Sequence, residues 1–113
     1  MRLAIPQSVV MAAVLVAAAA GSCAAAEPLS PSAQRGRTFV QANCAQCHAV
    51  GPDGASPLSV APPFRTLHRR YPVESLQEAL AEGIVTGHPT MPQFRLDPDQ
   101  IAGVIAYLKT LER

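Results

Sequence analysis

The chain is poor in the large aromatic residues from which a small protein usually builds its core. Its 113 residues include no tryptophan, two tyrosines and three phenylalanines. It also has a single lysine, Lys109, and its nine basic residues nearly balance eight acidic ones. Because nucleic-acid binding needs a clustered positive excess, no nucleic-acid partner is expected. A domain this short and this poor in aromatics needs a further source of stability.

No hydrophobic run is long enough to cross a membrane. The apolar stretch from Val9 to Ala20 falls short of the about 20 residues that a spanning helix requires. Arg2 precedes it, and small residues follow it to Ala26. This pattern predicts a secretory signal peptide over residues 1–26 and a domain over residues 27–113, which places the mature protein in the periplasm. An uncleaved membrane anchor is the alternative.

Cysteine is also scarce, and one of the three cysteines lies in the predicted signal peptide. Cys23 is lost if the chain is cut after Ala26. The alternative is that Cys23 becomes a lipid-modified N-terminus, because Ala20, Gly21 and Ser22 precede it. Lipoprotein signals usually carry leucine where this chain has Ala20, which weakens that interpretation.

The other two cysteines form the segment Cys44-Ala45-Gln46-Cys47-His48, whose spacing is typical of a c-type haem attachment site. One tight turn can hold both sulfurs along a porphyrin edge, where each adds to a vinyl group. His48 then lies close enough to bind the iron. Two other interpretations of the cysteine pair remain, a redox dithiol or half of a zinc site. The first lacks a βαβ context, and the second lacks a further ligand pair.

Capping residues and prolines predict the helices. Ser30-Pro31 begins one helix that runs to about Asn43, and Asp97-Pro98 begins the last, with Gln100 completing a capping box. One short helical turn is expected over 64–69 and a further helix from about 71–72 to Glu82, ended by Gly83. No strand-like alternation of useful length occurs, so the fold class is all-α.

The last helix carries a broad apolar stripe, and Gly103 is expected to lie off it, with Tyr107 at its border. The residues of the stripe are Ile101, Val104, Ile105, Leu108 and Leu111.

Only one methionine, Met91, remains in residues 27–113. It stands between Pro89 and Pro92, which restrict the backbone and so reduce the entropy lost when the side chain binds. A thioether is a suitable second axial ligand for haem iron and raises its potential. Met91 could instead fill a gap in the core. His88 and His68 are rival ligands.

The sequence resembles a class I c-type cytochrome of the bacterial monohaem type over nearly all of residues 27–113. The marks are Gly36, Phe39-Val40, Cys44-x-x-Cys47-His48, Ala61-Pro62-Pro63-Phe64, the proline-flanked Met91 and Val104-Ile105-Ala106-Tyr107-Leu108. The resemblance implies three to four helices around one covalently bound haem, with crossed first and last helices.

Several residue roles follow from the resemblance alone. Gly36 is expected to meet the turn around Val104 and Tyr107. Pro62, or the adjacent Pro63, is expected to accept a hydrogen bond from His48, which fixes the ring. The lysine-rich docking face of mitochondrial members is absent. The basic run Arg65, Arg69 and Arg70 is a solvated face, a propionate partner or a docking site for an acidic patch.

The resulting prediction is a monomeric periplasmic one-electron carrier rather than an enzyme. Its haem c has His48 and Met91 as axial ligands, and its redox protein partners bind transiently. One alternative is the electron-entry subunit of a periplasmic oxidoreductase complex. The other is a gas-binding haem protein, against which Met91 argues.

Overall fold

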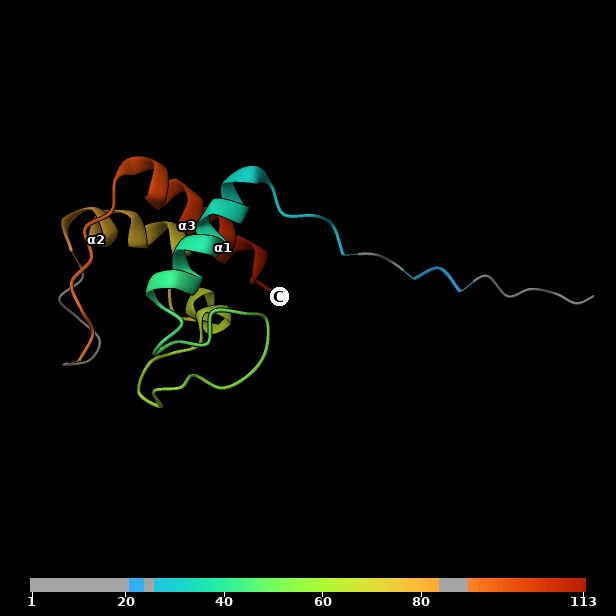
Figure 1. Ribbon diagram of the computed structural model, residues 1–113, viewed down its shortest axis with the longest axis horizontal. Coiled ribbons are helices and arrows are strands. Elements are labelled where there is room, and N and C mark those ends of the chain that lie inside the picture. Colours follow the sequence, from blue (N-terminus) through green and yellow to red (C-terminus); the bar gives the residue numbers. More distant parts are fainter. Residues whose placement is uncertain (1–20, 24–25, 84–89) are drawn as a thin grey trace, which may run out of the picture.

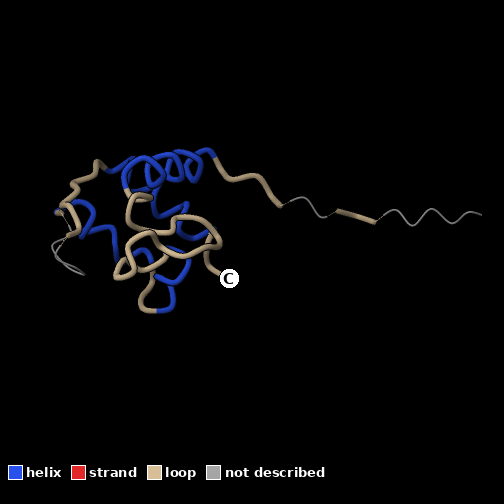
Figure 2. The backbone as a smooth tube through the Cα atoms, turned by 60° about the horizontal axis from the view of Figure 1, so that its bottom comes forward, coloured by secondary structure: helices blue, strands red, loops and turns tan. Residues whose placement is uncertain are grey.

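The computed structural model describes residues 21–23, 26–83 and 90–113. Within these residues the elements are α1 (Pro31–Asn43), η1 (Phe64–Arg69), η2 (Val73–Ser75), α2 (Leu76–Glu82) and α3 (Pro98–Thr110), where η denotes a 3₁₀ helix. The described part of the chain contains no strand, and loops connect the helices (Figure 2). The all-α prediction is therefore confirmed. No described helix has the length and apolar character needed to cross a bilayer.

Local signals set the ends of both long helices. The Ser30 hydroxyl accepts a hydrogen bond from the Ala33 amide at 3.1 Å, so Ser30 caps α1 and Pro31 is its first residue. Asp97 caps α3 through the Gln100 amide at 2.9 Å, and the Gln100 side chain returns a bond to the Asp97 amide. Both predicted N-termini are confirmed. They could be predicted because a cap depends only on residues within a few positions of it.

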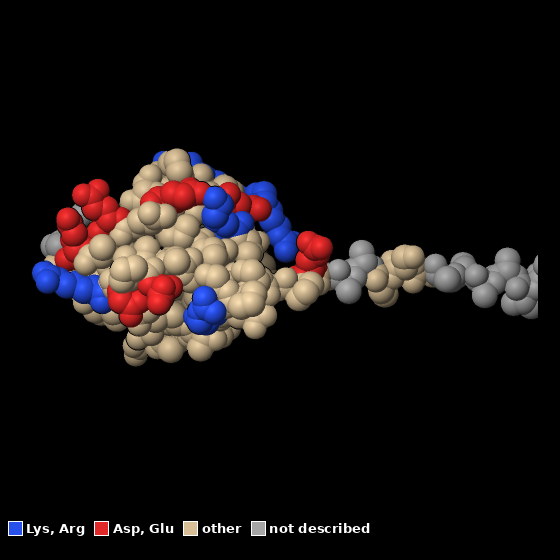
Figure 3. Space-filling model, turned by 90° about the horizontal axis from the view of Figure 1, so that it is seen from above, with Lys and Arg blue, Asp and Glu red and all other residues tan. Residues whose placement is uncertain are grey.

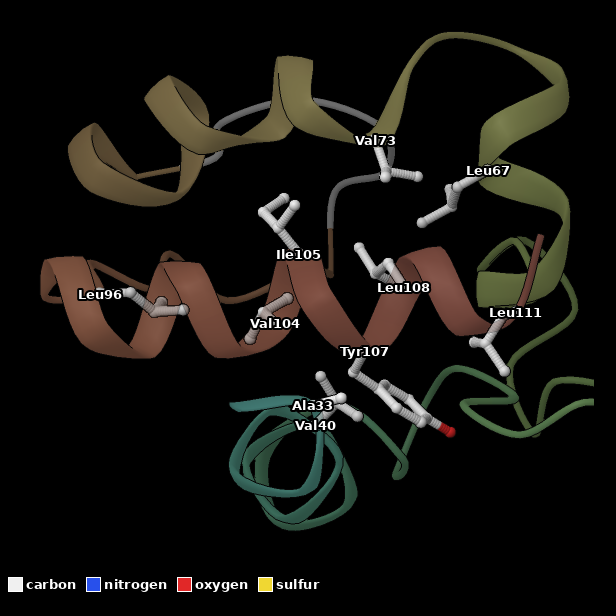
Figure 4. Packing of buried hydrophobic residues seen from close by; sticks show 10 residues of the cluster. All are labelled: Ala33, Val40, Leu67, Val73, Leu96, Val104, Ile105, Tyr107, Leu108 and Leu111. Carbon is white, nitrogen blue, oxygen red and sulfur yellow. The ribbon is translucent and has the colours of Figure 1, made fainter. Parts of the chain in front are cut away.

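Helices α1 and α3 cross and form the main packing of the fold. Figure 4 looks along α1 while α3 runs across the view, and Figure 1 shows the same pair side by side. A Cβ on Gly36 would lie 1.9 Å from the Gly103 oxygen and 2.8 Å from the Val104 nitrogen. The predicted contact of Gly36 with the turn around Val104 is thus present.

Gly103 corrects the sequence-based placement, which put it off the apolar stripe. It is buried, and a Cβ there would lie 3.1 Å from the Gly36 nitrogen and 3.2 Å from the Ser32 oxygen. The apolar stripe identifies side chains that need covering, whereas the place where two backbones touch depends on how the helices cross. Two glycines facing each other let the axes approach more closely than any other residue pair.

The tyrosine of α3 ties the helix to the loop that follows the cysteine pair. Tyr107 is 4% exposed, and its hydroxyl donates a hydrogen bond to the Val50 carbonyl at 2.6 Å. It therefore lies inside the packing rather than at the border of the stripe. The loop is further held by the bond from the Phe64 amide to the Ala49 oxygen at 2.9 Å.

The predicted helix from 71–72 to Glu82 begins one residue later, at Val73, and consists of η2 followed directly by α2. Pro72 is extended (φ −57°, ψ 132°), so the chain cannot be helical there. The Ser75 amide bonds to the Pro72 oxygen, a 3₁₀ step that precedes α2. Gly83 ends α2 with φ 104°, as predicted. The Leu96 amide bonds to the Leu80 oxygen at 2.9 Å, which fastens the segment before α3 to α2.

Buried hydrophobic residues from every helical element except α2 form one core around α3 (Figure 4). Leu76 and Leu80 of α2 are half-buried and pack against it. On the side opposite the α1 contact, α3 faces Val73 and Leu67. Five residues of this core also line a cavity, namely Val40, Leu67, Leu96, Val104 and Leu108.

Candidate functional site

The turn that leaves α1 gathers Cys44, Cys47 and His48. The Cys44 amide bonds back to the Val40 oxygen at 2.8 Å, so Cys44 caps the helix. The amides of Cys47 and His48 then both bond to the Cys44 oxygen, at 3.2 and 2.9 Å. Both thiols are half-buried, and no disulfide joins them. The spacing seen in the sequence thus becomes one closed turn that keeps two sulfurs and an imidazole together.

His48 is buried and its ring is held on two sides. Its Nδ1 lies 2.8 Å from the Pro62 carbonyl oxygen, and its ring centroid lies 4.9 Å from that of Phe64. Because a carbonyl can only accept, Nδ1 must carry the hydrogen. In the neutral ring the lone pair suited to a metal is then on Nε2.

The structure separates the two adjacent prolines that the sequence left as alternatives. The Pro62 oxygen is the partner of His48, whereas the Pro63 oxygen accepts bonds from the amide and the hydroxyl of Thr66 at 3.0 and 2.7 Å. The expected hydrogen bond therefore exists at Pro62. Phe64 follows directly and supplies the ring contact.

A cavity of about 360 Å³ opens beside His48. This volume lies within the roughly 300–1,000 Å³ of sites that hold small molecules and cofactors. Its lining is largely apolar and comes from all the helical elements and the segment before α3. The lining residues are Phe39, Val40, Cys44, His48, Pro62, Phe64, Leu67, Tyr71, Ser75, Leu76, Ala79, Leu80, Met91, Phe94, Leu96, Val104 and Leu108.

This lining brings together residues that are distant in the sequence. Cys44, His48 and Met91 all face the one cavity, although Met91 comes from the segment before α3 and the other two from the end of α1. Met91 is half-buried. Cys47 is half-buried in the turn but is not among the residues that line the cavity. An apolar space with a thiol, an imidazole nitrogen and a thioether at its wall fits an iron porphyrin attached through cysteine.

The aromatic residues, which sequence reasoning did not connect to the site, concentrate there. All three phenylalanines of the chain line the cavity, as does Tyr71. The scarcity of aromatic residues was the available signal for their role in the site. A chain with so few aromatic residues uses them where the most apolar surface is buried. Phe64, Tyr71 and Phe94 are distant from Cys44 along the sequence, so no local pattern connects them to it.

The environment of Cys44 bears on the dithiol alternative. Burial raises the pKa of the Cys44 thiol to about 11. A redox-active dithiol instead needs a lowered pKa, so that a thiolate is present to react. No group of three or more histidine, cysteine, aspartate or glutamate side chains within the described ranges is placed to hold a metal ion.

Neither the described rival ligand nor the basic run lies at the cavity. His68 lies half-buried in η1 and does not line the cavity, whereas His88 falls outside the described residues. Arg69 and Arg70 are exposed. Arg65 is half-buried, and its Nη1 has no hydrogen-bond partner in the described part of the chain. The lining of the cavity includes none of the three arginines.

The predicted signal peptide lies mostly outside the described residues. Of residues 1–26, the structure describes only 21–23 and 26, and Cys23 is exposed there.

Comparison with known proteins agrees with this site. The family model described as Cytochrome c matches residues 33–112. The chain is 37% identical to a cytochrome c-553-like protein from Synechocystis over 84 residues, which are 74% of this chain and 72% of the relative. It is also 37% identical to cytochrome c6 from Picosynechococcus over 82 residues, 67% of this chain and 70% of that protein. No solved structure matches it significantly.

The family match covers the cysteine pair, α1 from residue 33, all of α3 and every residue that lines the cavity. With relatives this similar over most of both chains, the expected cofactor is one covalently bound haem c, and the activity is electron transfer rather than catalysis. The chain belongs to the cytochrome c family and is a monohaem electron carrier.

Proposed function

We propose that this protein is a periplasmic one-electron carrier whose haem is attached through Cys44 and Cys47, with His48 and Met91 as axial ligands. The observation that carries the proposal is that His48 and Met91 line one cavity, with Cys44 beside them. When bound, haem supplies an iron that alternates between the ferrous and ferric states. The task of the protein is to hold, orient and enclose it.

His48 is the better-defined ligand, since its orientation is set by two contacts. The bond from Nδ1 to the Pro62 oxygen, at 2.8 Å, leaves Nε2 as the donor to iron and makes the imidazole more basic. The Phe64 ring limits rotation about the side chain. Such a ligand requires little rearrangement when the metal changes charge.

Met91 provides the second donor from a separate segment. The bond between the Leu96 amide and the Leu80 oxygen, at 2.9 Å, ties the segment that carries it to α2. Pro92 restricts the backbone next to it. A thioether ligand favours the ferrous state and so raises the reduction potential. The apolar lining keeps water from the iron, which argues for electron exchange rather than ligand turnover.

The location and partners follow from the N-terminus and the surface. A signal peptide over residues 1–26 delivers the chain to the periplasm, with lipid anchoring through Cys23 as the alternative. In the view of Figure 3 the acidic and basic side chains are interspersed and no large area carries one sign. We therefore expect brief contacts of small area with redox partners, with weak electrostatic steering.

The experiment combines mass spectrometry with one variant. Trypsin cuts after Arg37 and Arg65, so the peptide 38–65 should carry the mass of haem and neither of its cysteines should react with iodoacetamide. In Met91→Ala the haem should remain attached, while the weak sulfur-to-iron absorption band of the ferric protein disappears and the potential falls. The matched control is His68→Ala, which should change neither. An unmodified peptide 38–65 refutes the attachment, and an unchanged band in Met91→Ala refutes the ligand assignment.

A further inference from the structure

The cavity wall contains two polar side chains that the proposed function does not use. Of the residues that line it, only Cys44, His48, Tyr71 and Ser75 carry a polar or thiol group on the side chain, apart from the thioether of Met91. Cys44 and His48 are assigned to attachment and ligation. Tyr71 and Ser75 remain, two hydroxyls in a space whose other walls are apolar.

Both hydroxyl residues lie at the solvent side of the cavity. Tyr71 is 38% exposed and Ser75 is exposed, whereas Phe64, Leu67 and Leu76, their neighbours along the chain in the lining, are half-buried or buried. Neither hydroxyl forms a hydrogen bond with any residue that the structure describes. Two donors are thus available where the cavity meets water.

The backbone holds this pair in place. The Tyr71 amide bonds to the Leu67 oxygen at 3.3 Å, and the Ser75 amide bonds to the Pro72 oxygen at 3.0 Å. Pro72, between them, has its φ fixed by its ring. The two side chains therefore extend from a short, restrained connection between η1 and α2, which lowers the entropy cost of binding a ligand.

Haem brings two carboxylates that an apolar cavity cannot accept. An ionised carboxylate must stay close to water or to hydrogen-bond donors, and hydroxyl donors to an anion form short, strong bonds. We propose that the Tyr71 and Ser75 hydroxyls bind the propionate carboxylates of the haem. This inference depends on the proposed function, because it needs haem in this cavity. It also orients the group, with the vinyl edge at the cysteines and the propionate edge at Tyr71 and Ser75.

The test is the resonance Raman spectrum of the holoprotein, in which the propionate bending bands report hydrogen bonds to the carboxylates. Tyr71→Phe and Ser75→Ala should each shift a propionate band to lower frequency. Each should also lower the reduction potential, because a less compensated carboxylate favours ferric iron. The sulfur-to-iron absorption band should be unchanged in both, which shows that the haem is still attached and ligated.

Matched controls are available in the same chain. Tyr107→Phe removes a hydroxyl of the same kind that bonds to Val50 instead of lining the cavity, and Ser59→Ala removes an exposed loop hydroxyl. Neither should move the propionate bands. Arg70→Gln tests whether the exposed guanidinium next to Tyr71 binds a propionate instead.

Each outcome has a defined meaning. Unchanged bands in both Tyr71→Phe and Ser75→Ala overturn the inference while leaving the proposed function intact. A shift in Arg70→Gln alone overturns it too, since the guanidinium would then be the partner. A preparation without covalent haem refutes the proposed function and the inference together.

Discussion

Replacing Gly36 by alanine should separate the two crossed helices and destabilise the protein. The new Cβ would lie 1.9 Å from the Gly103 oxygen and 2.3 Å from its carbon, both backbone atoms that cannot rotate away. The helices must move apart by about 1 Å before the first contact reaches 3.0 Å, below which real Cβ atoms are essentially never found. Side chains along the whole contact, Val40 and Val104 among them, then lose close packing.

The size of the effect follows from two opposing terms. Overpacking costs about 1–3 kcal/mol, and a clash between two backbones lies at the top of that range. Alanine in place of glycine returns about 1 kcal/mol of helix propensity. The net loss is therefore about 2 kcal/mol, which lowers the melting temperature of a domain this size by roughly 8–16 °C.

The assay is urea and thermal unfolding of the holoprotein, followed by circular dichroism and by the haem absorption. Two control glycines complete the series. Gly103→Ala, whose Cβ would meet its nearest neighbours at 3.1 and 3.2 Å, should cost less than Gly36→Ala. Gly51→Ala meets nothing within 4 Å and should stay within about 0.5 kcal/mol of the parent. A Gly36→Ala protein as stable as Gly51→Ala would contradict the helix crossing described above.

Further variants test three single contacts. Tyr107→Phe leaves the Val50 carbonyl without its 2.6 Å donor and should cost about 1–2 kcal/mol in urea unfolding, with the absorption spectrum unchanged; an altered sulfur-to-iron band would instead connect Tyr107 to the iron. Asp97→Ala removes the cap of α3 and should cost about 1 kcal/mol, whereas Asp97→Asn, which can still cap, should be close to neutral; equal losses would deny the capping bond. Phe64→Leu removes the ring beside His48 and should broaden the haem NMR resonances through ring motion, without detaching the haem; sharp, unshifted resonances would show that the contact does not restrain His48.

Features that depend on neighbouring residues were predictable from the sequence. The ends of α1, the capping box of α3 and the Gly83 terminus are set by side chains within a few positions, and the structure has them where the sequence put them. The short turn over Phe64–Arg69 is also present. The hydrogen bond from His48 to the Pro62 carbonyl could be predicted only through the family resemblance, because the two residues are 14 positions apart.

Features that depend on how distant segments meet were not predictable. Gly103 was placed off the apolar stripe because an apolar pattern cannot show where a neighbouring backbone comes closest. The second helical segment begins only after Pro72 because Pro72 is extended, a conformation that a first-turn proline need not adopt. Tyr71 and Ser75 belong to a cavity whose wall is shared by segments from residue 39 to residue 108, and no local pattern shows that these segments meet.

The most direct test of the account is the proton NMR spectrum of the ferrous holoprotein. Met91 is the only methionine in residues 27–113. If its sulfur binds the iron opposite His48, the haem ring current must shift its methyl signal far upfield, and the signal must vanish in Met91→Ala. A ferrous spectrum without an upfield methyl signal, or one that keeps it in Met91→Ala, would contradict the central claim that this cavity holds a haem between His48 and Met91.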